Sequence, residues 1–423
     1  MELASKNWDV IVIGGGPAGL ASAVAAHDRG AKVCIIEREE RPGGILKQCI
    51  HDGFGVVRFK EKLTGPEYAH RFIDMARERN IPVFLNSFLT DITFKDGMYT
   101  LALVNNDEGA FYTKAPSVVM AMGCRERTDR QVFIQGERPS GIMTAGLAQY
   151  FINIQGYMPT KKCVILGSGD IGLIMARRLT LEGADVEGVY EILPEPSGLT
   201  RNVVQCLEDY NIPLHLSTTV TEVHGKNRVE GVTVAQVENF KPIPGTERYI
   251  ECDSLILSVG LIPENDIIEP LNVPMDPKTK GPLVDQNMMT MNPGIFSCGN
   301  ALHVNDLVDF VSESGDIAGE YAAKFSTNGT HKRNLVPVRT EGKIMYVVPQ
   351  YLDVNTKNKA TIYFRSSETF TNARLTVTAG GEQIISKKFR IVKPPEMERV
   401  AIDIEKIPEG AGEIVVELKQ EVK

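Results

Sequence analysis

Two stretches of the chain share one pattern, and this pattern restricts the possible folds more than any other feature. In the first copy, an apolar run at residues 10–13 leads into glycines with G-x-G-x-x-G spacing. Small residues continue from there to Gly30, and a second apolar run at 33–36 ends on Glu37. Short apolar runs of this kind predict strands buried on both faces of a parallel sheet, with a crossover helix between them.

The glycines of the first copy are Gly14, Gly16 and Gly19, and each meets a different steric demand. Gly14 permits a tight turn, Gly16 lets backbone N–H groups approach a pyrophosphate, and Gly19 lets the helix pack closely on the strand. The phosphates would lie at the helix N-terminus, where free N–H groups and the helix dipole favour negative charge. Glu37 follows Gly19 by 18 residues, a position from which a carboxylate accepts hydrogen bonds from a ribose. The first copy therefore predicts a dinucleotide site.

The same pattern returns in the middle of the chain. An apolar run at 163–166 precedes the second set of glycines, and another run at 186–190 precedes Glu191. These glycines are Gly167, Gly169 and Gly172. Glu191 lies 19 residues beyond the last of them. Two copies, each with a strand before it, a helix after it and an acid in place, favour two nucleotide sites over ordinary turn chemistry.

Later segments also occur in pairs. Meanders are predicted at 88–112 and at 220–237 with 249–251, and buried strands begin at Ser117 and Ser254. Further helices are predicted from the Thr64–Glu67 capping box to Arg79, from Thr144 to Ile154, and from Leu307 to Lys324. This order of elements predicts an α/β fold with two Rossmann-like dinucleotide-binding domains.

From Arg333 onward the chain changes character. Six short alternating runs are separated by turn residues, at 343–348, 360–364, 373–378, 383–391, 398–404 and 413–418. This spacing predicts a C-terminal β-sandwich module of immunoglobulin-like build. Because the module contains no recognisable catalytic set, we expect it to serve stability or docking.

The totals exclude several classes of protein. The length of 423 residues predicts two or three domains, and a net charge of −8 argues against binding to nucleic acid or to an acidic membrane. There is no run of 18 apolar residues to cross a membrane, and the polar start, Met1 to Trp8, lacks the apolar part of a secretion signal. Seven scattered cysteines without close pairs argue against structural disulfides and for a cytoplasmic location. His51 and His303 have no partners at metal-ligand spacing, so no metal is expected.

Together these motifs resemble the two-dinucleotide flavoprotein reductases of the thioredoxin-reductase and glutathione-reductase class. Three segments resemble one subgroup within it: Gly-Cys-Arg-Glu-Arg at 123–127, Gly-Ile-Met-Thr-Ala-Gly at 141–146 and Ser-Cys-Gly-Asn at 297–300. That subgroup contains the flavin subunits of hydrogen cyanide synthase, opine oxidase and sarcosine oxidase (alpha), and the oxidoreductases that accompany anaerobic glycerol-3-phosphate dehydrogenase. The resemblance covers about 8 to 330. It implies an FAD-binding domain made of 1–124 and 255–330, an NAD-binding domain at 125–254, and the β-sandwich at 335–423 as an addition.

The resemblance also implies which residues contact the two cofactors. Those for FAD are Gly14, Gly16, Pro17, Ala18, Gly19, Glu37, Arg38, Gly44, Gly123, Gly299, Asn300, Asp309 and Phe310. Those for NAD(H) are Gly167, Gly169, Asp170, Ile171, Gly172, Glu191 and Gly260. Asn300 departs from the class, which has an acid there for the ribityl chain. Glu191 favours NADH, because a carboxylate repels the 2′-phosphate of NADPH and residues 190–194 supply no arginine to offset it.

The expected chemistry is hydride transfer between NAD(H) and FAD, with electrons passed to or from a partner dehydrogenase or a small acceptor. The redox-active cysteine pair of the class is missing. Cys49 is a candidate single redox thiol, with His51 close by, although packing is the simpler interpretation. Cys124 and Cys298 are interpreted as packing residues.

Two alternatives remain open. One is a direct flavin oxidase or dehydrogenase of an amine or hydroxy acid, for which Arg125 and Arg127 are candidate carboxylate binders. The other is a flavin-binding subunit without catalysis. The intact second motif favours the NAD(H)-linked enzyme, and we expect an oligomer or a heteromeric complex with a protein partner such as a dehydrogenase subunit.

Overall fold

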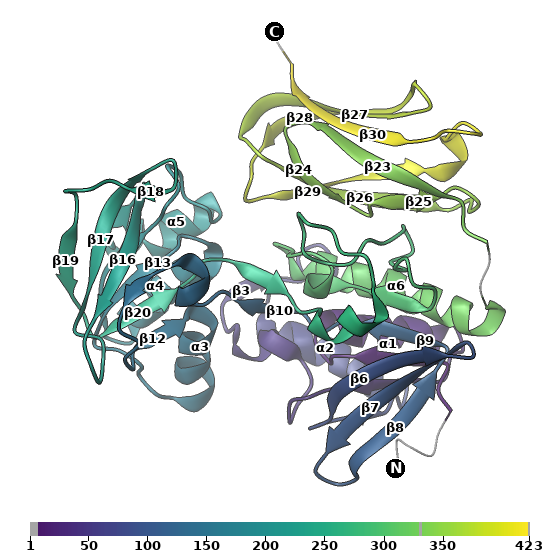
Figure 1. Ribbon diagram of the computed structural model, residues 1–423, viewed down its shortest axis with the longest axis horizontal. Helices are drawn as coiled ribbons and strands as arrows, with labels where there is room; N and C mark the ends of the chain where they lie inside the picture. The colour runs from purple at the N-terminus through teal and green to yellow at the C-terminus, as the bar shows by residue number, and fades with distance from the viewer. Residues whose placement is uncertain (1–6, 330–331, 422–423) are drawn as a thin grey trace. The chain divides into compact units, whose positions relative to one another are not determined.

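The computed structural model describes residues 7–329 and 332–421 (Figure 1). The chain divides into two compact units, one made of Met1–Cys124 with Pro263–Lys423 and the other of Arg125–Ile262. Strands β10 (Cys124–Glu126) and β21 (Leu261–Pro263), where the chain passes between the units, pair with each other. The expected absence of a secretion signal concerns mainly residues 1–6, which lie outside the described residues.

The first unit is built on a five-stranded parallel sheet. In spatial order its strands are β22 (Ile295–Ser297), β9 (Ser117–Met120), β1 (Val10–Ile13), β2 (Val33–Ile36) and β5 (Val83–Phe84). Every residue of β1, β2, β9 and β22 is buried, as the apolar runs predicted. The chain moves from β1 to β2 on one side and returns through β9 on the other. The strand order therefore reverses beside β1, and open α/β sheets bind ligands at the carboxyl ends of strands at such a point.

Three helices accompany this sheet: α1 (Pro17–Asp28), α2 (Gly65–Glu78) and α6 (Val308–Asn328). Helix α6 lies against α1 so closely that a Cβ on Gly315 would stand 2.3 Å from the carbonyl oxygen of Ala18. The predicted capping box at α2 is confirmed, because Thr64 and Glu67 each accept a backbone N–H from the other. The small residues of α6 thus bring a late segment of the chain against the first glycine motif.

The first unit also contains the predicted meander, which is confirmed as three antiparallel strands. They are β6 (Phe88–Lys95), β7 (Met98–Asn105) and β8 (Gly109–Ala115). Two short pieces lie between β2 and α2. They are the 3-10 helix η1 (Gly44–Gln48) and the paired strands β3 (Asp52–Phe54) and β4 (Leu63–Thr64).

The second unit repeats the parallel sheet. Its strands, in spatial order, are β12 (Ile142–Thr144), β20 (Ser254–Leu257), β13 (Lys162–Leu166), β14 (Asp185–Tyr190) and β15 (Leu214–His215). The family resemblance assigned 255–262 to the first domain. Strand β20 instead pairs in parallel with β13, so these residues belong to the second unit, which extends to Ile262.

The helices of the second unit are α3 (Ala145–Tyr150), α4 (Asp170–Leu181) and α5 (Thr200–Cys206). The predicted helix from Thr144 to Ile154 is α3 followed by a single π-helical turn, Phe151–Gln155. The second meander is confirmed as β16 (Thr218–His224), β17 (Gly231–Glu238) and β19 (Arg248–Glu251). The short strands β11 (Gln135–Gly136) and β18 (Lys241–Pro242) extend it.

The C-terminal module consists of two sheets. The larger has the order β25 (Tyr351–Asp353), β23 (Leu335–Gly342), β30 (Ile414–Gln420), β27 (Phe370–Ala379) and β28 (Glu382–Val392). The smaller has the order β24 (Ile344–Val348), β26 (Lys359–Ser366) and β29 (Met397–Asp403). The six predicted runs correspond to six of these strands, and β23 and β25 are additional. Together with the two units built on parallel sheets, the module confirms the predicted fold class.

Candidate nucleotide-binding sites

The loop between β1 and α1 forms the first candidate site. Gly14 has a φ of +102°, and a Cβ there would stand 2.4 Å from the carbonyl oxygen of Ala121 at the end of β9. A Cβ on Gly19 would stand 1.8 Å from the carbonyl oxygen of Gly14. These two positions therefore accept no side chain, as expected for a tight turn with a helix packed onto it.

The other side of this loop is open. A Cβ on Gly16 would come no closer than 3.8 Å, to Gly44, and one on Gly123 would meet nothing within 4 Å. Gly16 is the N-cap of α1 and Pro17 is its first residue, so no side chain of the cap covers the helix N-terminus. This end of the helix presents free N–H groups to a space bordered by glycines, and it therefore fits the pyrophosphate of a dinucleotide.

Glu37, at the end of β2, lies beside this space with only 5% of its surface exposed. Its Oε2 accepts the N–H of Gly15 at 2.7 Å, and its Oε1 accepts the N–H of Glu39 at 2.9 Å. A carboxylate has about four acceptor positions, so both oxygens keep one for ribose hydroxyls. Arg38 differs, because its side chain is 62% exposed and lies 3.8 Å from Glu39.

The remaining predicted FAD residues reach the same sheet edge from the end of β22. Gly299 packs against α1, because a Cβ added to Gly299 would lie 2.7 Å from the Cβ of Ala18. The Asn300 side chain accepts the N–H of Asn305 at 3.0 Å and donates to the sulfur of Cys124 at 3.6 Å. The segment from Gly299 therefore runs alongside α1 and the end of β9 before it enters α6.

Asp309 and Phe310 lie in the first turn of α6, and both are buried. Asp309 accepts the N–H of Arg58 at 2.8 Å, and the Arg58 guanidinium pairs with Asp316 at 2.5 Å. Sequence reasoning missed Arg58, because residues 48–58 have no periodic pattern that connects them to a helix far along the chain.

The cysteine predicted as a redox candidate is packed inside the protein. Cys49 is 5% exposed, burial raises the pKa of its thiol to about 12, and the thiol donates to the carbonyl of Ile45 at 3.4 Å. Such a thiol remains protonated at neutral pH. Burial also raises the pKa of Cys298. Within 7–329 and 332–421 no cysteine forms a disulfide, and no group of acids, histidines or cysteines has an arrangement that would hold a metal ion.

The second glycine loop repeats the geometry of the first. Gly167 has a φ of +99°, and a Cβ there would stand 2.1 Å from the carbonyl oxygen of Ser258. A Cβ on Gly172 would stand 2.5 Å from the carbonyl oxygen of Gly167, whereas Gly169 has only ordinary contacts. Gly260 lies in the loop that follows β20, where a Cβ would stand 3.9 Å from the Arg127 side chain.

Glu191 at the end of β14 is bonded more fully than Glu37. Its Oε2 accepts the N–H and hydroxyl of Ser168 at 2.9 and 2.6 Å and the hydroxyl of Ser197 at 2.9 Å. Its Oε1 accepts the N–H of Leu193 at 3.1 Å. Four donors leave little further acceptor capacity on this buried carboxylate.

The segment that carries Ser197 also holds the start of α4. Asp170, the first residue of that helix, accepts the N–H of Leu199 at 2.8 Å and the side chain of Asn202 at 2.7 Å. Ile171 is half-buried and packs against the core of the unit. The sequence pattern named Asp170 and Ile171 but not this segment, because its residues become neighbours of the glycine loop only through the fold.

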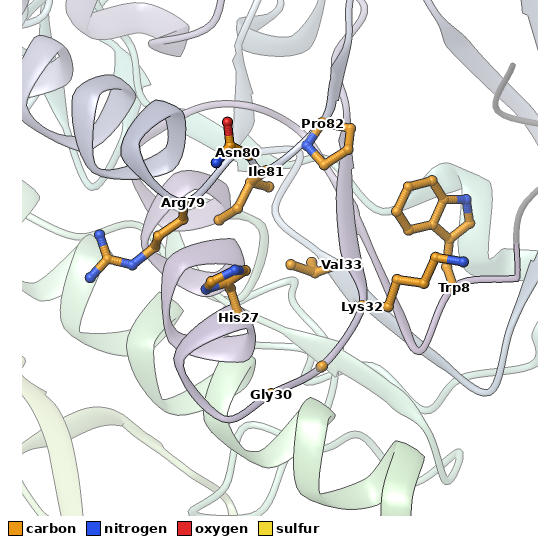
Figure 2. A pocket seen from close by; sticks show the side chains of 10 residues that line it. Trp8, His27, Gly30, Lys32, Val33, Arg79, Asn80, Ile81 and Pro82 are labelled. Atoms are coloured by element: carbon orange, nitrogen blue, oxygen red, sulfur yellow. The ribbon is translucent and has the colours of Figure 1, made fainter. Parts of the chain in front are cut away.

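A separate hollow of about 320 Å³ lies at the opposite edge of the first sheet, near the amino ends of β2 and β5 (Figure 2). Lys32 stands beside the ring of Trp8 there, with 5.4 Å between the ammonium and the ring centre. Arg79, which also lines the hollow, pairs with Asp28 at 2.7 Å. Because ligands of open α/β sheets bind at the carboxyl ends of strands, we assign no function to this hollow.

Comparisons with known proteins agree with this geometry. Residues 8–340 match the family described as pyridine nucleotide-disulphide oxidoreductase. The HcnB component of hydrogen cyanide synthase from Pseudomonas protegens is 26% identical over 62% of this chain and 58% of its own length. An opine oxidase subunit from Agrobacterium tumefaciens is 24% identical over 75% of this chain and 65% of its own length. The chain therefore spans less than two thirds of these relatives.

Solved structures show the same fold. The thioredoxin reductase of T. acidophilum superposes with a TM-score of 0.61 at 22% identity, over 76% of this chain and all of that one. The chain belongs to the pyridine nucleotide-disulphide oxidoreductase family. The resemblance seen in the sequence is thereby confirmed. No helix in the described part of the chain is long and apolar enough to span a membrane.

Proposed function

We propose that this enzyme transfers hydride between NAD(H) and a resident FAD, and exchanges electrons with a partner dehydrogenase or a small acceptor without a redox-active disulfide. The observation that supports this most strongly is the presence of two glycine cradles in one chain, each beside a buried carboxylate. We assign FAD to the first unit and NAD(H) to the second.

In the first site, bound FAD would supply the two-electron chemistry. The N-terminus of α1 would bind the pyrophosphate, and Glu37 would accept hydrogen bonds from the adenosine ribose. Asn300 would bond the ribityl chain. One helix dipole contributes only about 0.3–1 kcal/mol, so tight binding requires that several segments converge. The contacts among β1, β2, β9, α1 and the Gly299 segment provide that convergence.

In the second site, Glu191 would set the preference for NADH. Its carboxylate would accept one hydrogen bond from the ribose and would repel a 2′-phosphate. Ser168 and Ser197 hold the carboxylate through three bonds to one oxygen, which keeps the charge in place. NADPH should therefore reduce the enzyme much less efficiently than NADH.

The electron acceptor is proposed to be a protein subunit or a small molecule, because a disulfide is not available for the purpose. The sequence has no closely spaced cysteine pair, the described residues contain no disulfide, and burial raises the pKa of the Cys49 thiol. Two relatives are named as subunits, of hydrogen cyanide synthase and of opine oxidase. A heteromeric complex with a dehydrogenase subunit is therefore the assembly that we propose.

Anaerobic mixing of the purified, flavin-loaded protein with NADH or NADPH tests this function. Loss of the flavin absorbance with NADH, and much slower loss with NADPH, is expected. Bleaching by an amine or hydroxy acid but not by NADH would instead favour a direct flavin oxidase or dehydrogenase. No bleaching with any of them would favour a flavin-binding subunit without turnover.

A further inference from the structure

The smaller sheet of the C-terminal module contacts the start of α6, because Arg365 on β26 bonds Asp306 and Arg399 on β29 bonds Glu313. In this sheet Tyr346 is opposite Arg365, and Tyr363 is opposite Arg399. Side chains alternate across a strand, so Tyr363 and Arg365 share one face while Phe364 between them enters the core of the module. This face therefore carries charged and aromatic side chains, and Val348 and Met397 of the same sheet pack into the core that includes Phe310.

Arg365 forms an ion pair with Asp306, two residues before the start of α6. The other oxygen of the Asp306 carboxylate accepts the N–H of Met397 at 2.5 Å, from the neighbouring strand of the module. The two side chains of the pair are only 14% and 16% exposed, so solvent and salt screen their charges weakly. The module thus holds Asp306 through two of its strands.

Arg399 forms the second ion pair, with Glu313 in the second turn of α6. Its guanidinium also lies over the ring of Phe310, 4.7 Å from the ring centre. Tyr363 contacts the same ring, with 6.0 Å between the ring centres. The module therefore contacts the first turns of α6 through one ion pair and through two contacts with the Phe310 ring.

His303 shows how closely the module covers this segment. The imidazole is buried and contacts the rings of Tyr346 and Tyr363. The distance from its ring centre is 6.1 Å to the ring centre of Tyr346 and 5.8 Å to that of Tyr363. The segment from His303 to Glu313 leads from Asn300 into α6. The N-cap of that helix is Leu307, whose side chain has no acceptor for the backbone N–H groups. The entry to the helix is held by the module rather than by a cap of its own.

We propose that Arg365 and Arg399 are positioning residues for the bound flavin, which they influence by fixing the start of α6 and by neutralising Asp306 and Glu313. This inference rests on the proposed function and on the resemblance in the sequence, which implies that Asp309 and Phe310 in the first turn of α6 contact the FAD. Charge beside the ring system tunes the electronics of a flavin, and reduction adds negative charge to its pyrimidine side. Without its guanidinium partner, Asp306, whose side chain is 16% exposed, would therefore oppose reduction, and Glu313, at 34%, would do so more weakly because solvent screens it more.

The test measures the midpoint potential of the FAD-loaded variants Arg365→Met and Arg399→Met. At a fixed potential we expect the ratio of oxidised to reduced flavin to rise about tenfold. This corresponds to a shift of the midpoint potential by about 30 mV to more negative values for a two-electron couple. Arg365→Lys and Arg399→Lys keep the charge and should recover most of the wild-type potential. The KM for NADH should stay unchanged, because the second site is untouched.

Arg374→Met is the matched control. Arg374 pairs with Glu421 inside the module, and its side chain is 37% exposed against 38% for Arg399. We expect this variant to lose some stability and to keep the wild-type potential. If the Arg365 and Arg399 variants also keep that potential while their melting temperatures fall, the two arginines are structural and the proposal is wrong.

A charge deletion on the partner gives a result of opposite sign. Asp306→Asn removes the negative charge, so the midpoint potential should move to more positive values. Combining Asp306→Asn with Arg365→Met should reverse part of the negative shift that Arg365→Met causes alone. Equal shifts of one sign in both single variants would refute the electrostatic argument. Failure of the proposed function would be seen separately, in wild-type protein that binds no FAD or is not reduced by NADH.

Discussion

Replacing Glu37 by glutamine should weaken FAD binding and leave the second nucleotide site intact. Each oxygen of Glu37 already accepts one backbone N–H, from Gly15 at 2.7 Å and from Glu39 at 2.9 Å. An amide has only one acceptor oxygen, so its NH2 group must face one of these donors or turn away from both. In either case the ribose loses one hydrogen bond to a charged acceptor.

The size of this effect follows from the buried position of the carboxylate. A hydrogen bond to a charged group contributes about 1.5–3 kcal/mol, and a tenfold change in Kd corresponds to about 1.4 kcal/mol. The Kd of FAD should therefore rise by about 10- to 100-fold. Titration of the flavin-free protein with FAD, followed by the change in flavin fluorescence, measures it.

Glu191→Gln is the matched control, because it is the same substitution at the equivalent place in the second unit. It should raise the KM for NADH and leave the Kd of FAD unchanged. Urea denaturation of both flavin-free variants shows whether each remains folded. Wild-type FAD affinity in Glu37→Gln, or loss of FAD in Glu191→Gln, would show that the two sites are assigned incorrectly.

Three further outcomes are expected. In the Cys49→Ser variant, NADH should reduce the flavin at the wild-type rate in anaerobic stopped-flow measurements. The reason is that the buried thiol has a pKa of about 12 and stays protonated. Gly319→Val should lower the free energy of unfolding by about 1–3 kcal/mol in urea denaturation, since a Cβ there would stand 2.0 Å from the carbonyl oxygen of Ser22. Burial, with the charge of Arg365, lowers the pKa of His303 to about 3. Below about pH 6.5 the unfolded chain binds a proton at His303 that the folded chain excludes. The free energy of unfolding should therefore fall by about 1.4 kcal/mol for each pH unit by which the pH is lowered from 6.5 to 3. Urea denaturation at pH 7 and pH 5 should show this fall, and His303→Gln should reduce it.

The parts of the fold that sequence could predict are those set by neighbouring residues. Buried parallel strands need continuous apolar runs, and a turn that passes within 2.4 Å of a neighbouring backbone needs glycine at Gly14. The capping box at Thr64 likewise depends on residues only three positions apart. Such features have one physical cause each, and the structure confirms them.

Features that depend on distant residues could not be predicted in this way. Strand β20 has the same apolar character whichever sheet it joins, and its parallel pairing with β13 decides that it belongs to the second unit. Strand β23 was missed because Pro337 and its charged residues do not resemble an interior strand. Arg58 and Ser197 reach the sites from segments with no motif of their own.

The two acids also show that equal motifs do not make equal sites. Glu37 and Glu191 occupy the same place in their units, but Glu37 accepts two protein donors and Glu191 accepts four. With the cofactors assigned as proposed, the ribose of FAD meets a carboxylate with two positions still available, and the ribose of NADH meets one that is almost fully used. A resident cofactor needs tight binding, whereas a nicotinamide must leave after each hydride transfer. The serine hydroxyls around Glu191 therefore favour fast exchange at the second site, and removing one with Ser197→Ala should lower the KM for NADH rather than raise it.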